Sequence, residues 1–379
     1  MKNTRKIVAV ILAFLLAFSA VGSSFALSDE VKAQEIQTAV DGADAEKENS
    51  LAAVFEQLIA KIKRVILIIV GNISIILDGN YSKTDVAEYS SNAFAVPGLD
   101  DGFIPQGICY VEKLDAFALS GYIKGDNSRI YLVENGSDEA KELILKDFTK
   151  HAGGIASDGD DIWVCAGGNE SEGGFIYHLS ASFLDRASDG EEIEFDGSFQ
   201  TQVRASALCC DGEMLYVAEF YEEDDYPVNP SHSFEENNAW AVGYKLPVEA
   251  GEYDGTEKAP DVIISIPEKV QGMSVTDEGN VLFSTSYGRF YDSTLHVYEP
   301  FESWNQSEFD FDGTVVPFYA ASDESLVSKV KMPTLMEGID VEGSDLYAVF
   351  ESGAGAYSDA KEVITDVRRV EIAQLIAQL

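Results

Sequence analysis

The chain has 379 residues and a formal net charge of −40 at pH 7. A field of this sign repels the phosphates of nucleic acids and anionic membrane surfaces, so the composition excludes both as expected partners. It favours bound cations and neutral or cationic ligands. The length is sufficient for one large repeat fold with a small appendage.

Residues 1–26 have the three regions of a secretory signal peptide. Basic residues precede an apolar run over 7–20, and Ser24 and Ala26 supply the small residues before a cleavage site. The apolar run is short for a membrane-spanning helix, so a membrane anchor is the less favoured interpretation. The sequence therefore predicts a secreted, extracellular protein that is not attached to a membrane after cleavage.

Residues 27–91 are predicted to form a helical segment and a connector. In the first half of Leu51–Leu77, apolar residues recur at helical spacing between charged ones, and the second half is nearly all apolar but only 13 residues long. That half is too short to span a bilayer. We expect helices that bury an apolar face against the repeat domain or against a protein partner.

From residue 92 onward, one sequence pattern occurs five times. Each copy is a small residue and an apolar one, a short strand, an acidic or glycine-containing turn and a stronger β-strand. The anchor residues of the five copies are Gly107, Gly154, Ala207, Gly272 and Gly338. Repeats of roughly 40–50 residues with several strands each are typical of a β-propeller, and longer copies accommodate insertions.

The sequence thus predicts an all-β fold, a five-bladed β-propeller over residues 92–379. In the second copy, Ile193–Phe195 is predicted as the fourth strand. The last copy lacks a fourth strand, and residues 92–96 precede the first copy. An N-terminal strand that completes the last blade would close the ring and remove two exposed sheet edges. The long insertions, such as Glu302–Asp323, leave room for a sixth blade or a side lobe.

This repeated phrase, a small residue with Gly-Ile, a short turn, then Leu-Tyr-Val-Ala, resembles the blade motif of the NHL, YncE and SMP-30-like propellers. The resemblance covers about residues 92–372 and implies the fold. Those relatives include binding proteins, lactonases and cyclases. Metal-binding relatives similar to SMP-30 and paraoxonase place carboxylate and asparagine ligands at the mouth of the channel. Glu337 matches such a position, so the resemblance implies calcium with Glu337 as a ligand.

Propeller geometry brings two sets of residues to one face, around the channel mouth. The first set precedes the first strand of each copy and comprises Gln106, His151, Arg204, Gln271 and Glu337. The second lies at the ends of the second strands and comprises Ser120, Glu219, Ser286 and Glu351, with Tyr122, Tyr221 and Tyr287 beside them. Directed hydrogen bonds together with aromatic surfaces are what a small polar ligand such as a glycan or peptide requires.

Three functions remain open at this point. The favoured one is binding of a small polar ligand at the mouth. The second is a cation-dependent hydrolase or lactonase, in which Glu337, Glu351 and Glu219 supply catalytic carboxylates and His151 assists. The third is a scaffold that binds a protein through Leu51–Leu77. A purely structural role is the alternative for the mouth residues, which would then fill the channel by bonding neighbouring blades.

The insertion Glu222–Asn238 joins the second and third strands of the third copy, so we expect it to lie over the same mouth. Its carboxylates predict a lid, a site for a hard cation or a solvated acidic loop.

Overall fold

The structure is a computed structural model, and it describes residues 90–169, 171–248 and 252–376. The predicted signal peptide and the helical segment that contains Leu51–Leu77 lie outside the described residues, so both stay predictions. Within the described ranges, no helix is long and apolar enough to cross a membrane.

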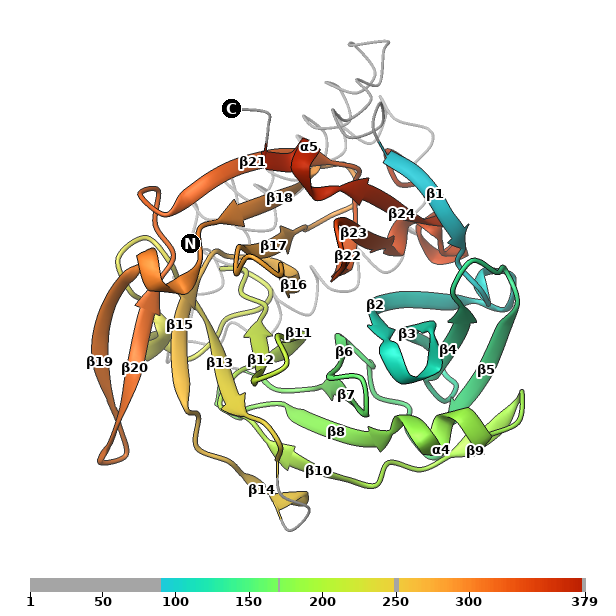
Figure 1. Cartoon of the computed structure of the whole chain (residues 1–379), viewed down its shortest axis with the longest axis horizontal. Helices are drawn as coiled ribbons and strands as arrows, with labels where there is room; N and C mark the ends of the chain where they lie inside the picture. Colours follow the sequence, from blue (N-terminus) through green and yellow to red (C-terminus); the bar gives the residue numbers. More distant parts are fainter. Residues whose placement is uncertain (1–89, 170, 249–251, 377–379) are drawn as a thin grey trace, which may run out of the picture. The chain divides into compact units, whose positions relative to one another are not determined.

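Five sheets form a ring, which confirms the five-bladed β-propeller (Figure 1). Blade 1 consists of β2 (Phe103–Val111), β3 (Ala116–Ile123), β4 (Arg129–Glu134) and β5 (Ala140–Leu145). Blade 2 consists of β6 (Ile155–Ser157), β7 (Asp161–Ala166), β8 (Phe175–Ser180) and β10 (Gly197–Gln200). Blade 3 consists of β11 (Ala205–Cys210), β12 (Met214–Glu219), β13 (Ala239–Lys245) and β15 (Val262–Ile266).

Blade 4 consists of β16 (Val270–Val275), β17 (Val281–Thr285), β18 (Ser293–Tyr298) and β21 (Leu326–Met332). Blade 5 consists of β22 (Met336–Glu342), β23 (Asp345–Phe350), β24 (Asp366–Glu371) and β1 (Ser90–Ala95). The N-terminal strand β1 pairs antiparallel with β24, so the predicted closure of the last blade is confirmed. A short helix, α5 (Ile372–Ile376), follows β24.

Three blades carry additional strands that the repeat pattern does not contain. After β8 and the helix α4 (Ala181–Arg186), the chain passes along blade 1, where β9 (Glu191–Ile193) pairs in parallel with β5. The prediction that Ile193–Phe195 forms the fourth strand of blade 2 is therefore wrong, because β10 occupies that position. In the same way, β14 (Asp254–Glu257) pairs in parallel with β10.

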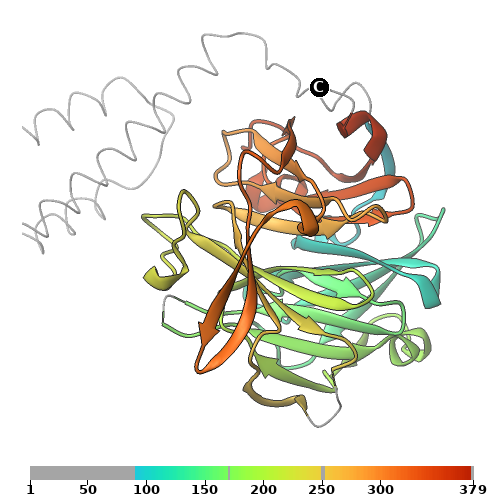
Figure 2. The same ribbon diagram turned by 60° about the vertical axis from the view of Figure 1, so that its left-hand side comes forward.

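The Glu302–Asp323 insertion forms a hairpin instead of a sixth blade. Its strands are β19 (Asn305–Phe311) and β20 (Thr314–Ala320), and β20 extends the sheet of blade 3 by parallel pairing with β15. Figure 2 shows this hairpin, in orange, along the outer edge of the ring. The predicted side lobe is thus a two-stranded extension of one blade.

Apolar side chains fill each interface between neighbouring blades. Five buried clusters occupy the five interfaces, and Trp163, Phe199, Phe283 and Phe350 are fully buried among them. Burying one large apolar side chain contributes about 1.5–3 kcal/mol to folding. Each blade is therefore held by the two blades beside it.

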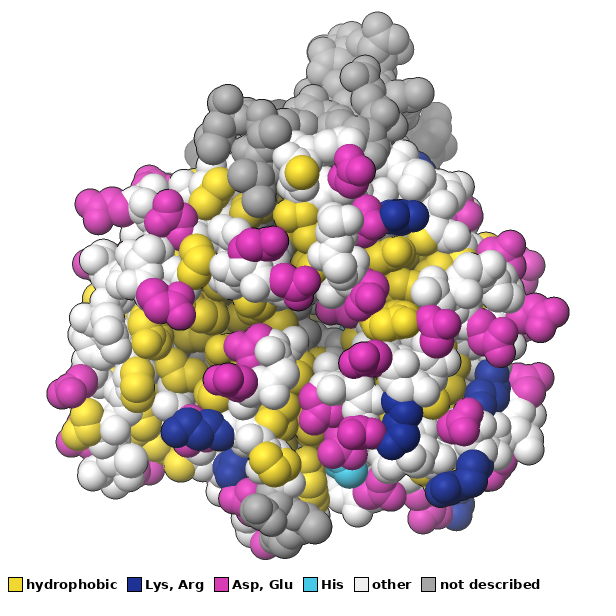
Figure 3. All heavy atoms as spheres, in the orientation of Figure 1, with side chains coloured by type: hydrophobic (Ala, Val, Ile, Leu, Met, Phe, Trp, Pro, Cys, Tyr) yellow, Lys and Arg dark blue, Asp and Glu magenta, His cyan; other side chains and the backbone are white. Residues whose placement is uncertain are grey.

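One face of the ring is markedly acidic. Figure 3 shows Asp and Glu side chains gathered around the centre of this face, with Lys and Arg side chains mostly farther out. The distribution agrees with the large negative net charge and favours the approach of cationic molecules.

Candidate functional site

A β-bulge near the start of four inner strands aims side chains toward one end of the propeller axis. We call this end, where the inner strands begin, the mouth. The pairing register shifts at Gln106, Ser206, Gln271 and in the Glu337 region. An extra residue in one strand re-aims its side chain out of the regular alternation. Three of the predicted mouth residues occupy such a bulge.

The carboxyl groups of Glu337 and Glu351 are both buried, with 2% and 8% of each residue exposed. Glu337 lies in β22, and Glu351 follows β23 directly. Burial raises the pKa of Glu337 well above its ordinary value, and the nearby Glu351 charge raises it further. Burial likewise raises the pKa of Glu351 to about 7. Because two negative charges in one dry site repel each other, the pair retains a proton into the neutral range.

A polar network connects this pair to blades 1 and 2. The Gln106 side chain donates from Nε2 to Oε1 of Glu351 at 3.0 Å, and its Oε1 contacts Nε2 of His151. The His151 ring packs on Tyr122, with 4.1 Å between ring centroids. The Tyr357 hydroxyl is hydrogen-bonded to both Glu351 and Tyr122.

We refer to these residues as the mouth cluster: Gln106, Tyr122, His151, Glu337, Glu351 and Tyr357. Desolvation lowers the pKa of the His151 ring, although the residue as a whole reaches the surface, so the imidazole is neutral near pH 7. The cluster therefore offers neutral donors and acceptors beside one shared proton.

The Glu222–Asn238 insertion packs over the neighbouring part of the mouth. Tyr287 donates a hydrogen bond from its hydroxyl to Asp225 of the insertion. The Arg204 guanidinium donates to the carbonyl oxygen of Pro227 at 3.1 Å and lies over the Tyr226 ring at 5.6 Å. These contacts hold the insertion against blades 3 and 4.

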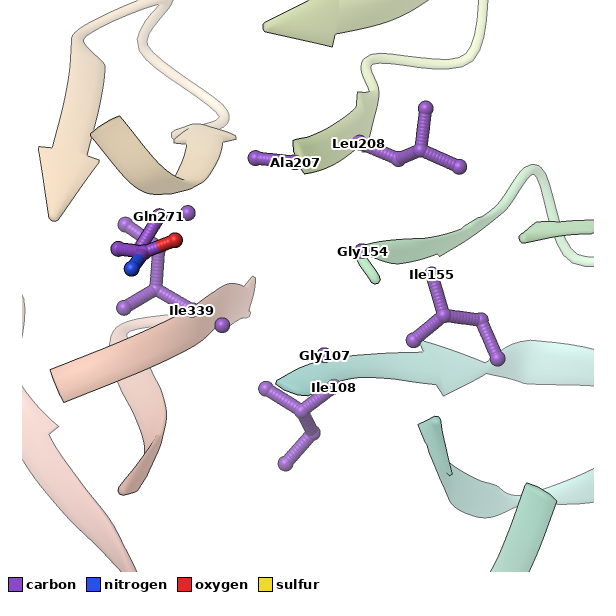
Figure 4. Close-up of a pocket in the computed structure, with 10 residues that line it drawn as sticks. Gly107, Ile108, Gly154, Ile155, Ala207, Leu208, Gln271 and Ile339 are labelled. Carbon is purple, nitrogen blue, oxygen red and sulfur yellow. The ribbon is translucent and has the colours of Figure 1, made fainter. Parts of the chain in front are cut away.

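Three other predicted ligand-binding residues have structural contacts in the same area. Tyr221 is half-buried, and its carbonyl oxygen accepts a hydrogen bond from the backbone of Lys269. Ser286 is buried and donates from its backbone N–H to the Lys269 carbonyl at 3.0 Å. Gln271 lines the axis itself, as Figure 4 shows. Their role in binding stays a prediction.

The axis below the mouth is closed by the inner strands. The space between them is too narrow to hold a water molecule, and four glycines surround it together with larger residues such as Ile108, Leu208 and Ile339 (Figure 4). A Cβ on Gly154 would lie 2.4 Å from the backbone nitrogen of Leu208, and one on Gly338 would lie 2.6 Å from the Cα of Gly107. Glycine at these positions permits close backbone approach. A ligand at the mouth therefore rests on a closed floor.

Glu219 belongs to a different polar cluster from Glu337 and Glu351. It is fully buried at the end of β12, where its Oε1 accepts hydrogen bonds from Nδ1 of His232 and from the backbone nitrogen of Trp240, both at 2.8 Å. The structure thus brings two of the three predicted carboxylates together and places the third in a separate environment.

Sequence reasoning missed Tyr357, His232 and Trp240. Tyr357 lies in a short turn after β23, and His232 lies in the Glu222–Asn238 insertion, so neither falls at a repeated position. Trp240 lies in β13 and looks like an ordinary strand residue. The available signal was residue type, since the chain has only 4 histidines and 3 tryptophans.

The mouth supplies few of the oxygen ligands that calcium requires. Calcium takes about 6–8 oxygen ligands, commonly from ionised carboxylates. Among the described residues, no group of three or more His, Cys, Asp or Glu side chains is arranged to hold a metal ion. Glu337 and Glu351 are the carboxyl groups of the mouth cluster, and both resist ionisation. Calcium at Glu337 therefore stays a prediction.

Comparison with known proteins gives a likeness to solved propellers. No family model and no curated protein matches the sequence. Glutaminyl cyclase from Myxococcus xanthus is 11% identical, with a TM-score of 0.41 over 74% of this chain and 94% of that one. The PQQ-bound aldose sugar dehydrogenase from Streptomyces coelicolor is 11% identical, with a TM-score of 0.35 over 74% of this chain and 96% of that one. Hydrazine synthase from Kuenenia stuttgartiensis is 13% identical, with a TM-score of 0.36 over 70% and 71%. At such identities the likeness concerns the fold alone.

Proposed function

We propose that the protein binds a small polar ligand, a glycan or a peptide, at the mouth of its propeller. One observation carries this proposal. Two buried carboxyl groups with raised pKa values lie near each other, and one of them, Glu351, is hydrogen-bonded to the amide of Gln106 and to the phenol of Tyr357, which joins blades 1 and 5. Titratable groups perturbed by burial and by each other occur preferentially at functional sites.

The chemistry of the mouth cluster suits a ligand rich in hydroxyl or amide groups. A protonated carboxyl donates one hydrogen bond and accepts others, so the Glu337–Glu351 pair can match either kind of group. Tyr122 and Tyr357 are half-buried and add aromatic surface beside the pair. Since the floor is closed, the ligand would enter and leave from the mouth side.

A second candidate function is acid–base hydrolysis of the bound ligand. The observation that favours it is the pKa of Glu351, which at about 7 suits a group that gives and takes protons near neutral pH. Glu337 would be its partner. In the cation-dependent form of this reaction, calcium would have to displace the proton that the pair retains.

Binding assays with glycan and peptide arrays test the first proposal. We expect Glu351→Gln and Glu337→Gln to weaken binding about tenfold or more, because each removes a proton that can move to suit the ligand. Exposed Glu213 provides a control variant, Glu213→Gln, with no expected effect. Equal binding by all variants would contradict the proposal.

Turnover of the same ligands separates the two candidates. A hydrolase should lose turnover in Glu351→Gln while its melting temperature stays near that of the parent, whereas a binding protein should release the ligand unchanged in every variant. If both variants bind normally but melt at a lower temperature, the mouth cluster is structural.

Secretion and a scaffold role are the remaining proposals. The released protein should begin at Leu27, which N-terminal sequencing measures. A scaffold should tolerate Glu337→Gln and lose its partner only when apolar residues of Leu51–Leu77 are replaced.

A further inference from the structure

A cavity of about 430 Å³ lies beside Glu219, between blades 2 and 3 and the β19–β20 hairpin. We call it the Glu219 cavity. Its volume falls in the range of small-molecule binding sites. Its lining comes from segments far apart in the chain: Gln200 and Gln202 from blade 2, Glu219 and Trp240 from blade 3, and Phe309 and Phe311 from the hairpin.

The Glu219 carboxylate lies at this cavity, and one of its two oxygens is hydrogen-bonded whereas the other is not. Oε1 is engaged by His232 and by the Trp240 backbone, whereas Oε2 is buried and has no hydrogen-bond partner among the described residues. The His232 ring is in turn stacked on Trp240, with centroids 4.0 Å apart and planes 14° apart, so both partners of Oε1 are themselves held by packing.

Trp240 presents a second unsatisfied group to the same region. Its Nε1–H is a buried donor without a partner among the described residues, and Trp240 is a lining residue of the cavity together with Glu219. A buried acceptor and a buried donor left unpaired both cost folding free energy. A molecule that satisfies both would regain that free energy on binding.

The walls favour a positively charged molecule. Four further carboxylates line the cavity, and its lining residues include no Lys or Arg. These four are Glu172, Glu257, Asp310 and Asp312. Trp240 and Phe309 pack edge to face at 5.1 Å, and Phe311 lies nearby, so aromatic surfaces are also present. Ammonium groups are attracted both to carboxylates and to aromatic faces.

We propose that the Glu219 cavity binds an amino-bearing polar molecule, whose ammonium group bonds Oε2 of Glu219 and whose oxygen accepts from Nε1 of Trp240. This ligand is held in a place distinct from the mouth cluster, and its binding involves no covalent step. The fixed carboxylate requires little reorganisation when the ligand arrives.

Calorimetric titration of the whole protein with glucosamine and with glucose tests the assignment. The two sugars have nearly the same shape, and glucosamine carries an ammonium group at C2 where glucose has a hydroxyl. We expect glucosamine to bind at millimolar concentration and glucose to bind about tenfold or more weakly. Equal binding of the two sugars, or no binding of either, overturns the proposal.

Variants locate the binding. Glu219→Gln keeps an oxygen for His232 and the Trp240 backbone but removes the charge, so glucosamine binding should fall about tenfold or more. Trp240→Phe removes the Nε1 donor and keeps most of the packing, and it should weaken binding severalfold. Glu213→Gln, an exposed change elsewhere in blade 3, should leave the titration unchanged.

Folding of each variant is checked by its near-ultraviolet circular dichroism. If Glu219→Gln fails to fold, Trp240→Phe decides the question by itself. If Glu219→Gln and Trp240→Phe both fold and both bind glucosamine as the parent protein does, the assignment is overturned. Since no mouth residue is changed in this assay, its failure and the failure of the mouth proposal are distinguishable.

Discussion

The mouth cluster and the Glu219 cavity handle buried carboxyl groups in opposite ways. At the mouth, burial raises the pKa of both Glu337 and Glu351, the Glu351 charge raises that of Glu337 further, and Glu351 is hydrogen-bonded by Gln106 above a closed axis. At the cavity, Glu219 stands next to a single histidine and keeps one oxygen unsatisfied beside about 430 Å³ of space.

The difference shows that burial alone does not indicate what a carboxyl group does. A pair that shares a proton changes its charge with pH, and its surroundings can rearrange around that proton. A carboxylate that is hydrogen-bonded to a histidine keeps its geometry and can bind a group of opposite charge. The four predictions below test this contrast, beginning with the close-packed axis on which both regions depend.

Closing the axis requires glycine at the inner strands, so Gly154→Ala should have the largest effect. The added Cβ would meet backbone atoms of Ala207 and Leu208 at 2.4–2.8 Å, and backbone cannot move aside as a side chain can. We expect a loss of about 3–5 kcal/mol in the free energy of unfolding, measured by urea titration.

The matched control is Gly355→Ala, whose Cβ would meet nothing within 4 Å. It should change stability by less than about 0.5 kcal/mol. Comparable losses in the two variants would show that the inner strands are not in close contact.

Removing the Glu219 carboxylate should lower the free energy of unfolding by less than Gly154→Ala does. Glu219→Ala leaves His232 and the Trp240 backbone nitrogen without their acceptor, and both are buried. We expect a loss of about 2–3 kcal/mol in the free energy of unfolding. Glu219→Gln retains an acceptor and should lose about 1 kcal/mol. An equal loss in both variants would argue that the Glu219 charge, not its hydrogen bonds, stabilises this region.

The mouth pair should make the protein more stable in mild acid than in mild alkali. The folded pKa of Glu351 is raised from 4.5 to about 7, so between these values the folded state binds more protons than the unfolded state. Stability then falls as pH rises through that window, by about 1–2 kcal/mol after allowance for relaxation at the mouth.

Thermal unfolding at pH 5 and pH 8 measures this slope. Glu351→Gln should flatten it and be relatively more stable at pH 8. Part of the slope should remain, because burial also raises the pKa of Asp340 to about 7. A stability that increases from pH 5 to pH 8 would mean that the pair is ionised in the folded protein.

Added calcium should change the melting temperature least of all, and the size of this change should depend on pH. Because the ion would have to displace protons from Glu337 and Glu351, the thermal shift should be under about 2 °C at pH 6 and larger at pH 8. Glu337→Gln should remove it. A shift of many degrees at pH 6 would instead indicate a site whose ligands are already ionised.

Much of the fold was predictable because each blade repeats the same two-strand phrase around Gly107, Gly154, Ala207, Gly272 and Gly338. The closing strand was predictable because the last copy lacked a partner for its edge. The parallel additions β9, β14 and β20 were not, since an edge strand can pair with whichever sheet lies beside it and no local pattern states which one.

The candidate site was predictable to the extent that it follows the repeat. Gln106, Gln271 and Glu337 occupy equivalent bulges, so alignment of the copies located them. Tyr357 and His232 come from turns outside the repeat, and their positions depend on how those turns pack. The depth of burial that shifts the pKa of Glu351 also arises only in the assembled ring.

The pairing of β1 with β24 means that the ring can close only late in biosynthesis, after the end of the chain has been made. Asn92 and Arg368, which bond each other across this seam, are 276 positions apart in the chain. At ribosomal rates of about 5–20 residues per second, the first strand waits on the order of tens of seconds for its partner. During that interval its edge is open to other chains, and the ring locks only when the final blade has been made.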